Sequence, residues 1–151
     1  MHKNIKIAIG SDHAGFQIKQ NLIEYYNKKD GYEVEDFGTY TEKSSDYPDY
    51  AHAVADEVQE GNHKFGIVIC GSGNGVNMTA NKHQGIRSAL CWNREVAGIV
   101  RKHNDANICA LPGRFITAIQ AIEIVEEFLN TDFEGGRHLT RINKIIPPVN
   151  C

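Results

Sequence analysis

The regular alternation of short apolar runs with longer amphipathic segments is the feature that most limits how this chain can fold. The pattern continues through residue 130 without a linker or an internal repeat. The expected strands are residues 6–11, 33–38, 65–71, 86–92 and 107–111. The expected helices are residues 16–29, 49–61, 75–82, 94–104 and 115–130. Such alternation is typical of a parallel sheet with helices on both faces.

The lengths and patterns of these segments refine the prediction. Residues 65–70 are continuously apolar, which predicts a strand covered on both faces, whereas residues 33–38 alternate and predict an edge strand. In the last long helix we expect Ile116, Ile119, Ile122 and Val125 to point inward. The chain of 151 residues has the size of one domain. We therefore predict a single α/β domain over residues 1–151, with a mostly parallel five-stranded sheet in a three-layer α/β/α sandwich.

Composition argues against several classes of protein. The formal charge is −3 and no basic run exceeds two residues, so a nucleic-acid-binding surface is not expected. No run approaches the roughly 20 apolar residues of a membrane span, and the N-terminal apolar run is too short for a signal peptide. Cys70, Cys91 and Cys109 close or interrupt apolar runs and Cys151 stands apart, with no CxxC spacing. Reduced, buried thiols and a cytoplasmic location are the simplest interpretation.

A glycine-rich loop follows the most apolar strand. Gly71, Gly73 and Gly75 allow a tight turn and close approach of a ligand, and the helix behind them offers free N–H groups to an anion. The loop is neither a Walker loop nor a GxGxxG dinucleotide motif. Cys70 precedes it, where a helix dipole stabilises a thiolate that could act as a nucleophile or a base. The alternative is a small buried residue that ends a core strand.

Other polar residues are expected at the same edge of the sheet, where ligands bind in such folds. Asp12 and His13 follow the first strand and suit proton transfer or phosphate binding, although Asp12 could simply cap a helix. His103 lies on the apolar side of its helix and is either catalytic or a core residue. Arg137 and Arg141, four residues apart, could bind a phosphate or form a solvated face.

The seven histidines show no HxxxH or HxH spacing. No metal site is predicted, and one built from distant residues stays open.

Six segments in order resemble those of type B ribose-5-phosphate isomerases, in the family that also contains galactose-6-phosphate isomerase subunits. They are GSDHAGF, DYPDYA, ICGSGNGVNMTANKHQGIRSALC, RKHNDANI, LPGR and FEGGRHLTRI, and together they span nearly the whole chain. The resemblance implies a Rossmann-like fold with a C-terminal helix and no cofactor or metal. It also implies a homodimer, which could pair further into a tetramer, with active sites between the subunits. The implied reaction interconverts ribose 5-phosphate and ribulose 5-phosphate in the pentose phosphate pathway.

The resemblance also implies roles for individual residues. Cys70 is the base that moves a proton from C2 to C1, Ser72 passes protons between O1 and O2, and Asp12 and His103 open the sugar ring. Some relatives use a carboxylate just after the glycine loop, where this chain has Val76. The remaining implied binding residues are Gly71, Gly73, Asn74 and Gly75 for the enediolate, His13, Arg114, Arg137 and Arg141 for the phosphate, and Tyr47 and Asn104 for the sugar.

Three other functions remain open from the sequence. The first is the same chemistry on a six-carbon substrate, allose 6-phosphate or galactose 6-phosphate. The second, from a different class, is a non-catalytic module that binds a phosphosugar or nucleotide. The third is a thiol redox protein, which the absence of a second cysteine near Cys70 in the sequence disfavours.

Overall fold

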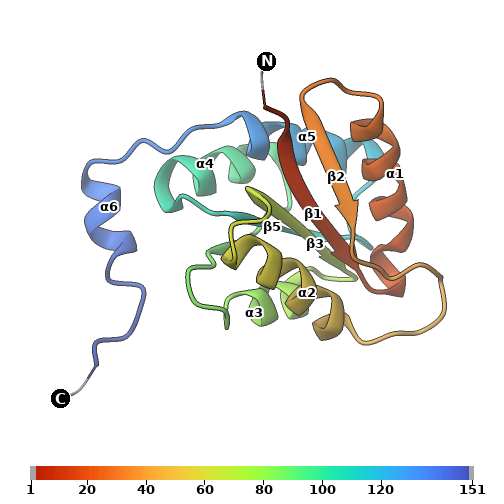
Figure 1. Ribbon diagram of the computed structural model, residues 1–151, viewed down its shortest axis with the longest axis horizontal. Coiled ribbons are helices and arrows are strands. Elements are labelled where there is room, and N and C mark those ends of the chain that lie inside the picture. Colours follow the sequence, from red (N-terminus) through yellow and green to blue (C-terminus); the bar gives the residue numbers. More distant parts are fainter. Residues whose placement is uncertain (1–2, 150–151) are drawn as a thin grey trace.

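The computed structural model describes residues 3–149 and contains a five-stranded sheet of order β2-β1-β3-β5-β4 (Figure 1). All neighbouring strands are parallel. The strands are β1 (Ile5–Ser11), β2 (Tyr32–Asp36), β3 (Phe65–Cys70), β4 (Ser88–Leu90) and β5 (Ile108–Pro112). The predicted parallel sheet is thus confirmed, with β3 in the centre and β2 at an edge.

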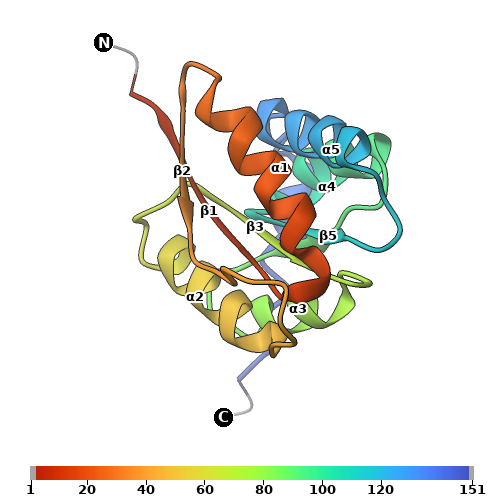
Figure 2. The same cartoon turned by 90° about the vertical axis from the view of Figure 1, so that its right-hand side faces the viewer.

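Helices cover both faces of the sheet, which confirms the three-layer Rossmann-like arrangement (Figure 2). One face carries α1 (Phe16–Asn27), α4 (Arg94–Asn104) and α5 (Ala118–Asn130). The other carries α2 (Tyr47–Gln59) and α3 (Asn74–Ala80). A short 3₁₀ turn, η1 (His13–Gly15), joins β1 to α1.

The central strand β3 explains why two separate cores form. All six of its residues are buried, as expected of a strand covered on both faces. Ile67 and Ile69 pack with α1 and α5, whereas Val68 and Cys70 pack with α2 and α3. Cys70 therefore ends the strand on the α2–α3 side of the sheet.

The predicted C-terminal helix is present as α6 (Arg137–Ile142) and stands apart from the sheet, beyond the end of α4 (Figure 1). Gly135 and Gly136, with φ of 69° and 59°, turn the chain into it. Glu134 N–H donates to the Lys102 carbonyl at 3.1 Å, which attaches the connecting segment to α4. The helix is consequently held at one end of the molecule.

The last long helix begins later than predicted. It starts at Ala118 because Thr117 caps it: the Thr117 hydroxyl accepts from Gln120 N–H, and the Gln120 side chain accepts from Thr117 N–H. The prediction that Ile119 points inward is wrong, since its side chain is 71% exposed. Val125 is buried as predicted, and the other buried residues of this helix are Ala121, Ile124, Phe128 and Leu129.

The described cysteines match the prediction of reduced thiols. Cys70, Cys91 and Cys109 are free and buried, and Cys151 lies outside the described residues. Burial and the neighbouring Cys91 thiol raise the pKa of Cys109, which makes it an inert core thiol. None of the helices described between residues 3 and 149 combines the length and apolar character that crossing a membrane requires.

Candidate active site

Cys70 opens onto a cavity of about 510 Å³ at the carboxyl edge of the sheet. We call this the thiol cavity. Its lining residues come from the ends of β1, β3 and β5 and from the starts of α2 and α3: Asp12, Tyr47, Cys70, Gly71, Ser72, Gly75, Met78, Arg114 and Phe115. Strand ends that meet at one edge thus bring together segments more than 50 residues apart.

The glycine loop is fixed against the end of β5. Gly113 N–H donates to the Cys70 carbonyl at 2.8 Å, and Arg114 N–H donates to the Gly71 carbonyl at 3.0 Å. Gly73 has φ of 75°, and a Cβ there would lie 2.5 Å from Leu90 Cδ1, so only glycine fits. These contacts fix the conformation of the loop, and the Cys70 side chain lines the cavity.

Asp12 both caps η1 and faces the thiol cavity. Its Oδ1 accepts from the N–H groups of Ala14 and Gly15 at 2.9 and 3.1 Å. Its Oδ2 accepts no hydrogen bond from the residues that the structure describes. Asp12 is only 6% exposed, so its carboxylate is held by one oxygen while the other can accept a proton from a ligand.

His13 is oriented by the loop that follows β2. Ser45 N–H donates to His13 Nδ1 at 3.2 Å. Because Nδ1 accepts this bond, the proton of the neutral ring is on Nε2, which is then free to donate to an anion.

A second cavity, of about 350 Å³, lies between the end of α4 and α6. We call this the arginine cavity. It is lined by His103, Asn104, Arg137, His138, Arg141, Ile142 and Ile145. Arg137 and Arg141 are exposed and, within residues 3–149, form no ion pair or side-chain hydrogen bond. Two uncommitted guanidinium groups on one face of a helix suit a phosphate.

The histidines of the arginine cavity lie against each other. The rings of His103 and His138 stack with centroids 4.3 Å apart and an angle of 12° between their planes. Burial, and next the charge of Arg137, lower the pKa of His138. His138 is thus a neutral ring at neutral pH.

Hydrogen bonds from two arginines hold the turn at the end of α4, where His103 and Asn104 lie. Asp105 ends α4 with φ of 45°, and Arg101 Nη1 donates to its carboxylate at 2.8 Å. Arg87 donates from Nε to the carbonyls of Asn104 and Asp105 at 2.9 and 3.2 Å. The end of α4 is therefore a rigid support for the two residues that face the arginine cavity.

The structure divides the predicted site residues between the two cavities, which share no lining residue. The thiol cavity contains Asp12, Tyr47, Cys70, Gly71, Ser72, Gly75 and Arg114. The arginine cavity contains His103, Asn104, Arg137 and Arg141, and His13, Gly73 and Asn74 line neither. Sequence reasoning missed Met78, Phe115, His138, Ile142 and Ile145. Two features of the sequence could have indicated some of them. Met78 lies three residues after Gly75, and His138 and Ile142 directly follow Arg137 and Arg141.

The chain matches known sugar-phosphate isomerases along nearly its whole length. The family model for ribose/galactose isomerase matches residues 7–145. A probable ribose-5-phosphate isomerase B of Mycoplasma genitalium is 43% identical over 145 residues, with 95% of each chain covered. The crystal structure of a ribose 5-phosphate isomerase from Thermotoga maritima aligns with a TM-score of 0.91 at 51% identity, covering 93% of this chain and 97% of that one. A Mycoplasma genitalium ribose-5-phosphate isomerase B with bound ribulose-5-phosphate aligns with a TM-score of 0.89 at 42% identity, covering 95% of each chain.

Proposed function

This chain belongs to the ribose/galactose isomerase family, and from that premise we propose that it interconverts ribose 5-phosphate and ribulose 5-phosphate. The observation that carries the proposal is the position of Cys70, at the end of the central strand and on the wall of a cavity that also contains Ser72 and Asp12. The free thiols support a cytoplasmic enzyme, where the pentose phosphate pathway would supply its substrate.

Cys70 is the base of the isomerisation step. Its thiolate takes the proton from C2 of the open-chain aldose, and the electron pair of that bond moves through C1 to O1, giving an enediolate. The same sulfur then returns the proton to C1 while the carbonyl forms at C2. The residue just after the glycine loop, Val76, is fully buried and cannot ionise, so that position supplies no carboxylate base.

Ser72 transfers protons between O1 and O2 of the sugar, and the glycine loop stabilises the negative charge that develops there. Asn74 N–H donates to Ser72 Oγ at 3.2 Å, which leaves the hydroxyl hydrogen of Ser72 free to move between O2 and O1. The N–H groups of Gly71, Gly73 and Gly75 face the developing oxyanion, and fixed donors of this kind stabilise a transition state more than a ground state.

Ring opening needs residues from both cavities. Asp12 Oδ2 accepts the proton of the 1-hydroxyl group, and His103 donates a proton to the ring oxygen as the bond from C1 to that oxygen breaks. Arg137 and Arg141 bind the phosphate, joined by His13 Nε2–H and Arg114, while Tyr47 and Asn104 contact the sugar.

Two copies of the chain complete the site. Within one copy Cys70 lines the thiol cavity, His103 lines the arginine cavity, and the two cavities share no lining residue. Exposed apolar side chains surround both cavities: Tyr47, Met78 and Phe115 near the first, and Leu139, Ile145 and Ile146 near the second. We therefore propose a homodimer in which the α6 end of one subunit covers the thiol cavity of the other.

Solvent isotope exchange tests this function directly. In deuterated water, with a chelator present, the enzyme should convert ribose 5-phosphate to ribulose 5-phosphate and incorporate deuterium at the exchanged carbon. Binding of ribose 5-phosphate without exchange would instead identify a non-catalytic binding module. Allose 6-phosphate and galactose 6-phosphate, assayed in parallel, should turn over more slowly, and faster turnover of either would reassign the substrate.

A further inference from the structure

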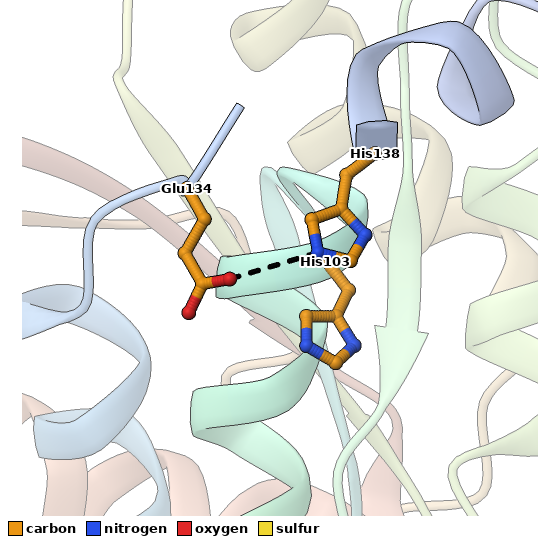
Figure 3. A group of neighbouring side chains, drawn as sticks. All are labelled: His103, Glu134 and His138. Carbon is orange, nitrogen blue, oxygen red and sulfur yellow. Dashed lines mark ion pairs between the residues drawn. The ribbon is translucent and has the colours of Figure 1, made fainter. Parts of the chain in front are cut away.

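Three possible metal ligands meet at the end of α4, outside the thiol cavity. One ring nitrogen each of His103 and His138 and one carboxylate oxygen of Glu134 all lie within 4.8 Å of one another (Figure 3). His138 Nε2 is 3.6 Å from Glu134 Oε2. We call these three residues the His–Glu cluster.

His138 contributes a buried ring nitrogen that makes no hydrogen bond within the described part of the chain, since Glu134 Oε2 at 3.6 Å is too distant for one. His138 is only 5% exposed, and its Nε2 makes no hydrogen bond to any residue between 3 and 149. Leaving such an atom unsatisfied costs about 1–3 kcal/mol, so buried ring nitrogens nearly always have a partner. An ion bound beside Nε2 would supply that partner.

The backbone holds the other ligands in place. Glu134 is attached to α4 by the hydrogen bond from its N–H to the Lys102 carbonyl, next to His103. His138 lies four residues after Glu134, and its own N–H donates to the Gly135 carbonyl at 3.2 Å. Two chain segments thus bring the three side chains near one another, with the Glu134 side chain half-exposed.

The chemistry of the donors selects the ion. Two imidazoles and one carboxylate, with a further position open to water, are a common ligand set for Zn²⁺. Mg²⁺ and Ca²⁺ prefer oxygen donors and would gain little from two ring nitrogens.

We propose that the His–Glu cluster binds Zn²⁺, and that the ion inhibits the enzyme by occupying the arginine cavity. Arg137 and Arg141 line the same cavity, and their charge weakens binding of a dication, so the site is a regulatory or inhibitory one and not a structural zinc site. The stacked rings of His103 and His138 are nearly parallel and cannot both aim a nitrogen at one ion. The half-exposed His103 ring must therefore rotate, which removes it from the position needed for ring opening.

Zn²⁺ binding, measured by calorimetry without substrate, tests the site independently of the reaction. Glu134→Gln keeps the shape of the side chain and removes the charged ligand, and Glu95→Gln on exposed Glu95 is the matched control. Cys70→Ala removes the competing thiol. We expect one Zn²⁺ per chain in the wild type, in Glu95→Gln and in Cys70→Ala, and about tenfold or weaker affinity in Glu134→Gln.

Two results would overturn the proposal: unchanged Zn²⁺ affinity in Glu134→Gln, or loss of binding in Cys70→Ala. The inhibition, unlike the binding, rests on the proposed function. In isomerase assays Zn²⁺ should compete with ribose 5-phosphate, and Glu134→Gln should resist it with an unaltered rate in zinc-free buffer. Equal inhibition of both proteins would contradict an inhibitory role for this cluster. A chain that binds Zn²⁺ through Glu134 but lacks isomerase activity would refute the proposed reaction and leave the metal site standing.

Discussion

Arg101 donates a hydrogen bond to the carboxylate of Asp105 at 2.8 Å, across the last turn of α4. Arg101 is 7% exposed, and its guanidinium carbon lies 5.0 and 5.7 Å from the ring centroids of Phe65 and Phe128. It also donates to the carbonyls of Ala106 and Thr131. A buried arginine thus fixes the turn that presents His103 and Asn104.

Replacing Arg101 should destabilise the protein substantially. Arg101→Met keeps an apolar contact with the two phenylalanine rings but leaves two backbone carbonyls without their donor, so we expect a loss of about 3 kcal/mol in the free energy of unfolding. Urea denaturation measures this. Lys102→Met, at an exposed neighbouring position, should change it little. Equal free energies of unfolding for the two variants would show that the hydrogen bonds of Arg101 do not stabilise the fold.

Arg137 should contribute mainly to substrate affinity. Arg137→Ala removes one of the two uncommitted guanidinium groups of the arginine cavity, and a hydrogen bond to a charged group contributes roughly 1.5–3 kcal/mol. We expect KM for ribose 5-phosphate to rise about tenfold or more, with kcat less affected. Lys144→Ala, on the same exposed segment, is the control. An unchanged KM in Arg137→Ala would remove this residue from the phosphate site.

His138 should make the folded protein sensitive to acid. Burial lowers its pKa, with Arg137, His103 and Arg141 acting in the same direction and Glu134 opposing them. Because the folded pKa lies below the unfolded one, the unfolded chain binds the proton first as pH falls. Stability is therefore lost from about pH 6.5 downward, and the loss is complete below the folded pKa.

Thermal unfolding between about pH 7.5 and pH 5 checks this linkage. The Tm of the wild type should fall more steeply over that range than the Tm of His138→Asn, which has no group to protonate there. Parallel slopes for the two proteins would mean that His138 is protonated as readily in the folded state as in the unfolded chain.

Much of the fold follows from the sequence because its signals are local. The apolar run 65–70 and the alternating run 33–38 predict their strands, and the edge rule for parallel sheets brings Asp12, Cys70 and Arg114 to one cavity. The exposure of Ile119 could not be predicted from apolar spacing alone, since the Thr117 cap decides where its helix begins. Arg101 is buried because Phe65 and Phe128, distant in the sequence, enclose it.

The division of the site depends on information that local patterns do not carry. Whether Arg137 lies beside Cys70 or far from it is determined by the path of residues 131–136, where two glycines with positive φ turn the chain. His138 follows Arg137 in the sequence, yet its burial and its stack on His103 arise only from the packing of α6 on α4.

Mixing two inactive variants tests whether the active site is shared between subunits. Cys70→Ala and His103→Ala should each be inactive, because every site of either homodimer lacks one catalytic group. In a mixed dimer one of the two sites combines an intact Cys70 with an intact His103. After subunit exchange of equal amounts, activity should return to about a quarter of the wild-type level. No recovery, with exchange verified by mass spectrometry of the native dimers, would argue for a site within one chain.

The most direct measurement is the rate at which Cys70→Ala exchanges the C2 hydrogen of ribose 5-phosphate with solvent deuterium. Removing a general base typically costs about 10²–10⁴ in rate, and the phosphate ligands remain, so exchange should fall by that factor while calorimetry gives a nearly unchanged affinity for the sugar. Cys91→Ala, at a core thiol outside the cavity, should still exchange. Near-wild-type exchange by Cys70→Ala would contradict the assignment of Cys70 as the base.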